Sequence, residues 1–286
     1  MLQDLAGGRL ENEFRRAAPG EEAAVVCIRQ ESILLKRNSD DTLEFPRVSQ
    51  VRRWSDQWAH WNEEALQYVF RLDGVAYFLW MGQAGDCPDR AYAYEPARSL
   101  RQMISKDICY AAMTAWHLYN WYASSRFCGR CGGKTQHDEK ERMMRCPNCG
   151  LMIYPRINPA VIVAVTDGDR ILFTKYAGRS YTRYALIAGF TEIGETLEQT
   201  VQREVMEEVG LRVRNIRYYK SQPWGVDGNV LMGFFCDLDG DDAITLDRQE
   251  LSVAEWHHRH QLPAQDDGIS LTREMMRIFS EGREPR

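Results

Sequence analysis

The sequence predicts an α+β protein with more than one domain, and three observations support that fold class. The 286 residues, 44% of them hydrophobic, can form two modest cores, because domains usually contain roughly 100 to 150 residues. Short apolar runs alternate with turns up to about residue 95, as strands do, and a helical spacing of apolar residues follows. Two C-x-x-C pairs then precede a C-terminal half that mixes buried-strand and helix patterns. We expect a strand-rich N-terminal domain (residues 1–97), a connecting helix (98–125), a cysteine module (126–154) and a second α+β domain (155–286).

The charge of the chain excludes bulk attraction to polyanions. Its 36 basic and 41 acidic residues give a formal net charge of -5. To bind nucleic acid or an anionic membrane surface, the protein would therefore need local positive charge or a metal ion. The first 16 residues are too charged for the apolar core of a signal peptide, and no run reaches the roughly 18 apolar residues of a spanning helix. These patterns predict a soluble cytoplasmic protein.

The N-terminal domain carries strand and hairpin signals. Apolar runs occupy residues 23–28, 32–35, 69–72 and 75–80, and Asp73-Gly74 between the last two is a strong hairpin turn. Three tryptophans recur at helical spacing, which suits packing better than a stacking platform: Trp54, Trp58 and Trp61. Nothing here indicates catalytic chemistry. The domain is interpreted as a degenerate copy of the fold expected for the C-terminal half.

From residue 98 the spacing of apolar residues predicts the connecting helix. His117 inside it has no ligand at a suitable spacing, so it is expected to be packed or solvated.

The cysteines divide into two groups. Cys128 and Cys131 form one C-x-x-C pair, Cys146 and Cys149 form the other, and a glycine follows each pair. Two such turns direct four thiolates at one ion and leave no position for water, so the sequence predicts a structural zinc ion rather than a catalytic one. A redox pair is the alternative, and the duplication argues against it. The other four are expected to be reduced and without function: Cys27, Cys87, Cys109 and Cys236.

A glycine-rich loop followed by an acidic helix is the most informative segment. The helix is expected over residues 196–209, with a buried stripe of Leu197, Val201 and Val205, and Gly210 ends it. Three glutamates at positions i, i+3 and i+4 then share one surface patch: Glu204, Glu207 and Glu208. Because like charges repel, the patch predicts a hard cation such as Mg²⁺ or Mn²⁺, with a solvated acidic face as the alternative.

The complete spacing from Gly189 to Leu211 fits G-x5-E-x7-R-E-U-x-E-E-x-G-U, where U is a bulky aliphatic residue. This segment resembles the Nudix hydrolases, which cleave a nucleoside diphosphate linked to another group. The resemblance implies an α/β/α sandwich with a mixed sheet, and metal held by the loop and helix. Metal neutralises the phosphate oxygens and lowers the pKa of bound water, and a carboxylate completes the deprotonation. Glu208 is the first choice for ligand and catalytic carboxylate. Glu204 and Glu207 are companion ligands, Arg203 orients them, and Glu195 organises the loop.

A zinc ribbon before this domain is similar to the NAD(H) pyrophosphatases of the superfamily, over roughly residues 98–285. Their S-Q-P-W motif matches residues 221–224. The resemblance implies that the substrate is NAD(H), which is cleaved to nicotinamide mononucleotide and AMP, with NAD-capped RNA as a further substrate. It also implies a homodimer. Ala188 (through its carbonyl) and Glu250 match metal positions. The substrate positions matched are Glu141, Tyr154, Phe190, Gln222, Pro223, Trp224 and Asn229.

One departure from the family concerns the substrate. Many members continue the motif as P-W-P-F-P, whereas this chain has Gly225, Val226 and Asp227 after Trp224. An added negative charge there leaves the metal chemistry unchanged but puts the substrate in question. The alternatives are therefore another nucleoside diphosphate derivative (ADP-ribose, a nucleotide sugar or coenzyme A) or a non-catalytic ligand-sensing module. A histidine group is expected to be solvated rather than metal-binding: His257, His258 and His260.

Overall fold

The computed structural model describes residues 1–5, 9–54, 63–82, 85–102, 105–178, 182–261 and 268–285. The chain divides into two units. One holds residues 2–156 and 225–228, and the other holds Met1 with residues 157–224 and 229–286. None of the helices described has both the length and the apolar character needed to cross a membrane.

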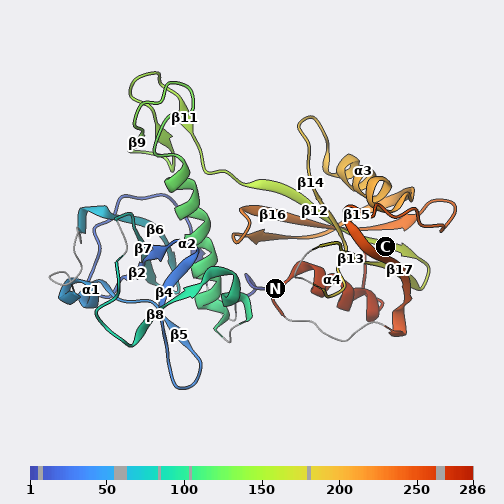
Figure 1. Cartoon of the computed structure of the whole chain (residues 1–286), viewed down its shortest axis with the longest axis horizontal. Coiled ribbons are helices and arrows are strands. Elements are labelled where there is room, and N and C mark those ends of the chain that lie inside the picture. The colour runs from blue at the N-terminus through green and yellow to red at the C-terminus, as the bar shows by residue number, and fades with distance from the viewer. Residues whose placement is uncertain are drawn as a thin grey trace. The chain divides into compact units, whose positions relative to one another are not determined.

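The first unit is rich in strands, as predicted (Figure 1). One sheet has the order β1-β6-β7-β2, and in a second sheet β4 pairs with β3, β5 and β8. The predicted hairpin is β6–β7, and both turn residues, Asp73 and Gly74, have positive φ. The strands are β1 (Leu10–Glu11), β2 (Ala24–Val26), β3 (Ile28–Arg29), β4 (Ser32–Arg37), β5 (Leu43–Glu44), β6 (Leu66–Leu72), β7 (Val75–Trp80) and β8 (Tyr92–Pro96). The short helices are α1 (Val48–Trp54), η1 (Glu63–Ala65) and η2 (Ala97–Gln102).

Trp54 packs in the core of this unit, against Tyr92 at 5.1 Å between ring centroids. The packing interpretation is therefore confirmed for Trp54, while Trp58 and Trp61 lie outside the described residues. The connecting helix, α2 (Lys106–Ser124), begins later than expected because the 3-10 turn η2 precedes it. His117 on α2 is hydrogen-bonded to the Arg156 carbonyl at 2.8 Å, as a packed histidine would be. A three-stranded ribbon follows: β9 (Gln136–His137), β10 (Met144–Arg145) and β11 (Met152–Ile153).

The second unit is an α/β/α sandwich, as the resemblance implied. Its sheet has the order β15-β16-β12-β13-β17, with β14 also paired to β12. The β12–β16 pair is parallel and the others are antiparallel, so the sheet is mixed. The strands are β12 (Asn158–Asp167), β13 (Arg170–Tyr176), β14 (Ile187–Phe190), β15 (Val213–Trp224), β16 (Asn229–Leu238) and β17 (Leu251–His258). The helices are α3 (Leu197–Val209), η3 (Arg259–Gln261) and α4 (Leu271–Ser280).

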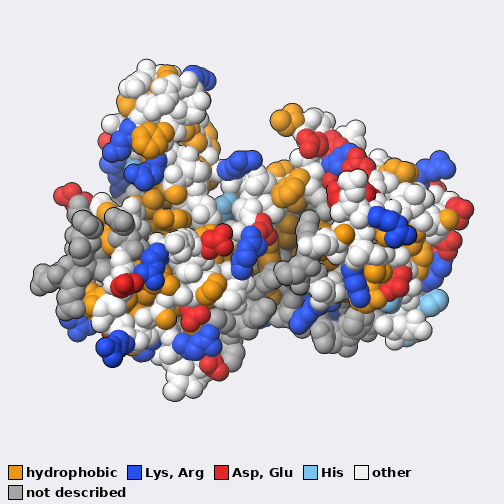
Figure 2. Space-filling view, in the orientation of Figure 1, with side chains coloured by type: hydrophobic (Ala, Val, Ile, Leu, Met, Phe, Trp, Pro, Cys, Tyr) orange, Lys and Arg blue, Asp and Glu red, His pale blue; other side chains and the backbone are white. Residues whose placement is uncertain are grey.

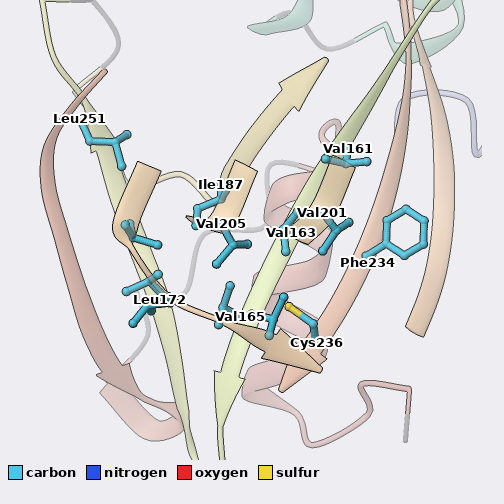
Figure 3. Packing of buried hydrophobic residues seen from close by; sticks show 13 residues of the cluster. Val161, Val163, Val165, Leu172, Ile187, Val201, Val205, Phe234, Cys236 and Leu251 are labelled. Carbon is cyan, nitrogen blue, oxygen red and sulfur yellow. The ribbon is translucent and has the colours of Figure 1, made fainter. Parts of the chain in front are cut away.

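Alternation along β12 explains why a helix covers each face of the sheet. Val161, Val163 and Val165 pack into the core that contains Val201 and Val205 of α3 (Figure 3). The intervening Ile162 and Ala164 pack with α4, together with Leu271, Met275 and Phe279. Because successive strand residues point to opposite faces, one apolar strand supports both layers.

The ends of α3 are fixed by local sequence. Thr196 caps the first turn, since its hydroxyl accepts from the Gln199 amide while the Gln199 side chain accepts from the Thr196 amide. Gly210 ends the helix in a left-handed conformation, as predicted. The buried stripe is Val201, Val205 and Val209, and Leu197 is only partly buried.

Candidate functional site

The four ribbon cysteines form one donor set. All four sulfur atoms lie within 4.8 Å of one another, and Cys128–Cys149 and Cys131–Cys146 are both separated by 3.5 Å. Four thiolates about 2.3 Å from a zinc ion lie about 3.8 Å apart, so these residues fit zinc. Each knuckle closes through a positive-φ glycine, Gly132 or Gly150, whose amide donates to the carbonyl of the first cysteine of its pair. The donor set is complete without water, as expected for structural zinc.

Arg203 is the centre of the acidic site on α3. Its guanidinium donates to both carboxylate oxygens of Glu195, at 2.6 and 2.9 Å, and to the Phe190 carbonyl at 2.9 Å. It also donates to Glu204 at 2.7 Å and to Glu207 at 3.0 Å. Figure 2 shows acidic and basic side chains together over α3. Arg203 therefore joins the glycine-rich loop to the helix, and the contact expected between Glu195 and Arg203 is present.

The carboxylates of this site differ in environment. The ion pair with Arg203 lowers the pKa of Glu195 to about 2, and hydrogen bonds from the Glu192 amide and the Thr200 hydroxyl contribute. Burial raises the pKa of Glu204 against the opposing effect of Arg203. Glu204 and Glu208 are 8% and 3% exposed.

Buried carboxylates that face further acidic groups suit a divalent cation, which would offset their repulsion. Glu207 is exposed, and both it and Glu250 contribute to the raised pKa of Glu204. Among the described residues, however, only the cysteines bring three ligand atoms within 4.8 Å of one another. The glutamates thus share one region without forming a closed cage, which suits an ion such as Mg²⁺ that retains several waters.

Gly189 leaves the space that the carboxylate of Glu204 occupies. A Cβ atom at Gly189 would lie 1.8 Å from the Glu204 Cδ and 2.0 Å from its Oε1. The first glycine of the signature is therefore required by close approach, since its φ is not positive. Ala188, the expected carbonyl ligand, immediately precedes it on β14, and Glu250 immediately precedes β17.

The predicted substrate residues fall in both units. Tyr154 is 53% exposed and its hydroxyl is 2.9 Å from a Glu141 carboxylate oxygen, within the ribbon. Phe190, 54% exposed, lies on β14 of the other unit. An aromatic side chain with its face in solvent can stack on a flat base.

Gln222, a predicted substrate residue, is buried against the start of α4. Its side chain is fully buried, donates to the Ile269 carbonyl at 2.7 Å and accepts from the Leu271 amide at 2.8 Å. Both polar groups of the amide thus hold the start of α4, and the predicted contact of Gln222 with substrate stays a prediction. Its neighbour Pro223 is exposed and Trp224 is partly buried. Asn229 is 8% exposed, and its Oδ1 has no hydrogen-bond partner among the residues described.

The negative charge in the altered turn after the S-Q-P-W motif is paired with an arginine. Asp227 accepts from Arg98 at 2.9 Å, which neutralises the added negative charge. Gly225 approaches α2 so closely that a Cβ atom would lie 2.3 Å from the Met113 carbonyl oxygen. This ion pair offsets the added negative charge at the turn.

Three contributors to the α3 site were not predicted from the sequence. The Thr200 hydroxyl donates to Glu195 at 3.0 Å, and the Phe190 carbonyl accepts from Arg203. The third is the capping pair Thr196 and Gln199, which the T-x-x-Q spacing could have revealed. The histidine group forms no metal set within the described part of the chain, and His257 lies 3.0 Å from Glu255.

Comparison with known proteins gives two family matches. The NUDIX domain matches residues 156–277, and the NADH pyrophosphatase zinc ribbon domain matches residues 123–154. The NAD-capped RNA hydrolase NudC of Photorhabdus laumondii is 40% identical over 167 residues, which is 58% of this chain and 65% of that protein. NudC of Haemophilus influenzae strain Rd is 34% identical over 225 residues, covering 76% of this chain and 83% of that protein. NudC of Vibrio cholerae is 36% identical over 211 residues, covering 73% and 76%.

A solved NUDIX hydrolase from Nitrosomonas europaea is 24% identical to the chain, with a TM-score of 0.46 over 55% of this chain and 91% of that one.

Proposed function

Because the chain belongs to the Nudix hydrolases that carry an NADH pyrophosphatase zinc ribbon, we propose that it hydrolyses the pyrophosphate bond of NAD(H) to nicotinamide mononucleotide and AMP. NAD-capped RNA is a second proposed substrate, since the relatives compared above are named for that activity. The main support for the proposal is the set of carboxylates that Arg203 holds on α3. The same chain also has the four-cysteine ribbon.

Glu204, Glu207 and Glu208 would hold Mg²⁺ or Mn²⁺, with Glu250 and the Ala188 carbonyl as further ligands. The metal supplies charge neutralisation at the diphosphate and a water of lowered pKa. Arg203 fixes the carboxylates through charge-assisted bonds, so they need not reorganise when substrate binds. Glu208, which is 3% exposed, takes the proton from the attacking water.

Base recognition is assigned to two exposed aromatic side chains, Tyr154 and Phe190. Stacking on a nicotinamide or adenine ring contributes about 1 to 3 kcal/mol per base. Gln222, Pro223, Trp224, Asn229 and Glu141 complete the proposed set, and the Gln222 side chain also holds the start of α4. Homodimer formation is also proposed.

The activity is assigned to the cytoplasm, where thiols stay reduced and where NAD and RNA occur. All eight cysteines are free of disulfides.

The experiment is a substrate panel with Mn²⁺ and zinc-loaded protein: NADH, NAD, ADP-ribose, a nucleotide sugar, coenzyme A and NAD-capped RNA. Products are identified by mass spectrometry. We expect nicotinamide mononucleotide and AMP from NAD(H). If ADP-ribose is turned over much faster than NADH, ADP-ribose rather than NAD(H) is the substrate. Tight dinucleotide binding without hydrolysis would instead support a sensing module, which the intact set of Arg203 and three glutamates argues against.

A further inference from the structure

Arg142, in the ribbon between β9 and β10, has a charge that no described carboxylate neutralises. One terminal nitrogen donates to the Val69 carbonyl at 2.6 Å and to the Asn12 carbonyl at 3.1 Å. The other terminal nitrogen is buried and has no hydrogen-bond partner among the described residues. Burial lowers the pKa of Arg142, as expected where a cation loses water without gaining an anion. Neutral carbonyls therefore hold this side chain in place, and its charge remains uncompensated.

Two residues of β6, the strand that Arg142 contacts, also have a buried polar atom without a hydrogen-bond partner in the described part of the chain: Arg71 and Tyr68. The Arg71 Nε is buried without a hydrogen-bond acceptor within the described ranges, and Arg71 has no ion pair there. The hydroxyl of Tyr68, a residue that is 4% exposed, also has no partner in the described part of the chain. Burial raises the pKa of Tyr68 most. Its hydroxyl is also close enough to Arg15, Arg71 and Arg142 for these to lower the pKa, and to Glu11 for that carboxylate to raise it.

The nearby carboxylates lie closest to Arg15 rather than to Arg71 or Arg142. Glu11 faces Arg71 in the β1–β6 register, but its carboxylate lies 3.5 Å from Arg15. Glu13 also lies nearest Arg15, at 3.7 Å. Figure 2 shows several Lys and Arg side chains gathered near the part of the chain that Figure 1 labels β9. The site thus has donors and positive charge without a matching acceptor.

Buried donors without acceptors are rare in native proteins, and each calls for an acceptor such as water or an ion. A water molecule would satisfy hydrogen bonds but not two cationic charges. An oxyanion with several oxygens satisfies both, and guanidinium groups bind phosphate with matching geometry. We propose that Tyr68, Arg71 and Arg142 form a binding site for a phosphate group, separate from the carboxylates of α3. Inorganic phosphate and the 5′-phosphate of a released nucleotide share this chemistry.

The test is isothermal titration of the zinc-loaded full chain without added Mg²⁺ or Mn²⁺, so that no metal holds phosphate at the α3 carboxylates. Separate titrations use inorganic phosphate and AMP at constant ionic strength, which identifies the source of the phosphate. We expect saturable binding that weakens roughly tenfold or more in Arg71→Met and Tyr68→Phe. Arg29→Met, which breaks an exposed ion pair with Asp86 in the same unit, is the matched control. It should bind as the wild type does.

Two outcomes would overturn the proposal: no saturable binding by the wild type, or equal binding by the wild type and both variants. Circular dichroism and zinc content check that the variants fold. NADH turnover with Mn²⁺ should stay at the wild-type level in Tyr68→Phe, because this residue is not part of the proposed catalytic machinery. The phosphate site and the proposed activity can therefore fail independently.

Discussion

Gly189→Ala should disable the enzyme without unfolding it. The added Cβ would lie 1.8 Å from the Glu204 Cδ, whereas ordinary contact begins at 3.4 Å, so the carboxylate must move by the difference, 1.6 Å. That displacement breaks the 2.7 Å bond from Arg203 to Glu204, which as a charge-assisted bond contributes about 1.5 to 3 kcal/mol. A misplacement on the order of 1 Å in a catalytic group costs about 100-fold in rate. We therefore expect NADH turnover to fall about 100-fold.

The assay is steady-state NADH hydrolysis with Mn²⁺, with thermal unfolding measured in parallel. Gly20→Ala is the matched control, because nothing lies within 4 Å of its Cβ position. Adding Glu204→Asp to Gly189→Ala shortens the acidic side chain and should restore part of the lost activity. Turnover within about twofold of the wild type in Gly189→Ala would show that the position of the Glu204 carboxylate does not limit activity, because a 1.6 Å displacement predicts a far larger loss.

Four further predictions concern single residues. Glu208→Gln keeps size and loses charge, so turnover should drop on the order of 100-fold or more with an unchanged melting temperature. Cys146→Ser should lower zinc content and melting temperature together, as measured by metal analysis and calorimetry. Thr196→Ala removes the cap of α3 and should lower the free energy of unfolding by about 0.5 to 2 kcal/mol in urea titrations. The folded-state pKa of Glu195 is depressed to about 2, so its stabilisation is present above its unfolded value of 4.5 and is lost as pH falls toward 2. In Glu195→Gln, the free energy of unfolding should therefore depend less on pH between 4.5 and 2 than it does in the wild type. An unchanged pH dependence would contradict the ion pair with Arg203.

The sequence was sufficient for the features that depend on local spacing. The α3 helix follows from its apolar stripe and from Gly210, and the zinc set follows from two C-x-x-C turns. Each depends on residues close in sequence, so periodicity and turn chemistry determine them. The sandwich architecture with its mixed sheet and the substrate residues came from family resemblance instead.

Features made by contacts between distant residues were not predictable in this way. The Gln222 amide holds residues near position 270, and Arg98 neutralises Asp227, both across long stretches of sequence. Nothing in an S-Q-P-W motif indicates that its glutamine is buried, because burial depends on where α4 packs. For the same reason the uncompensated Arg142 could not be recognised from its neighbours in the ribbon.

Metal binding by the carboxylates of α3 is tested most directly by Mn²⁺ binding to the zinc-loaded chain, followed by electron paramagnetic resonance. We expect saturable binding that is lost when Glu207→Gln and Glu208→Gln are combined, with zinc content unchanged. If the double variant binds Mn²⁺ as tightly as the wild type, or if the wild type binds none, the carboxylates of α3 are not the metal site.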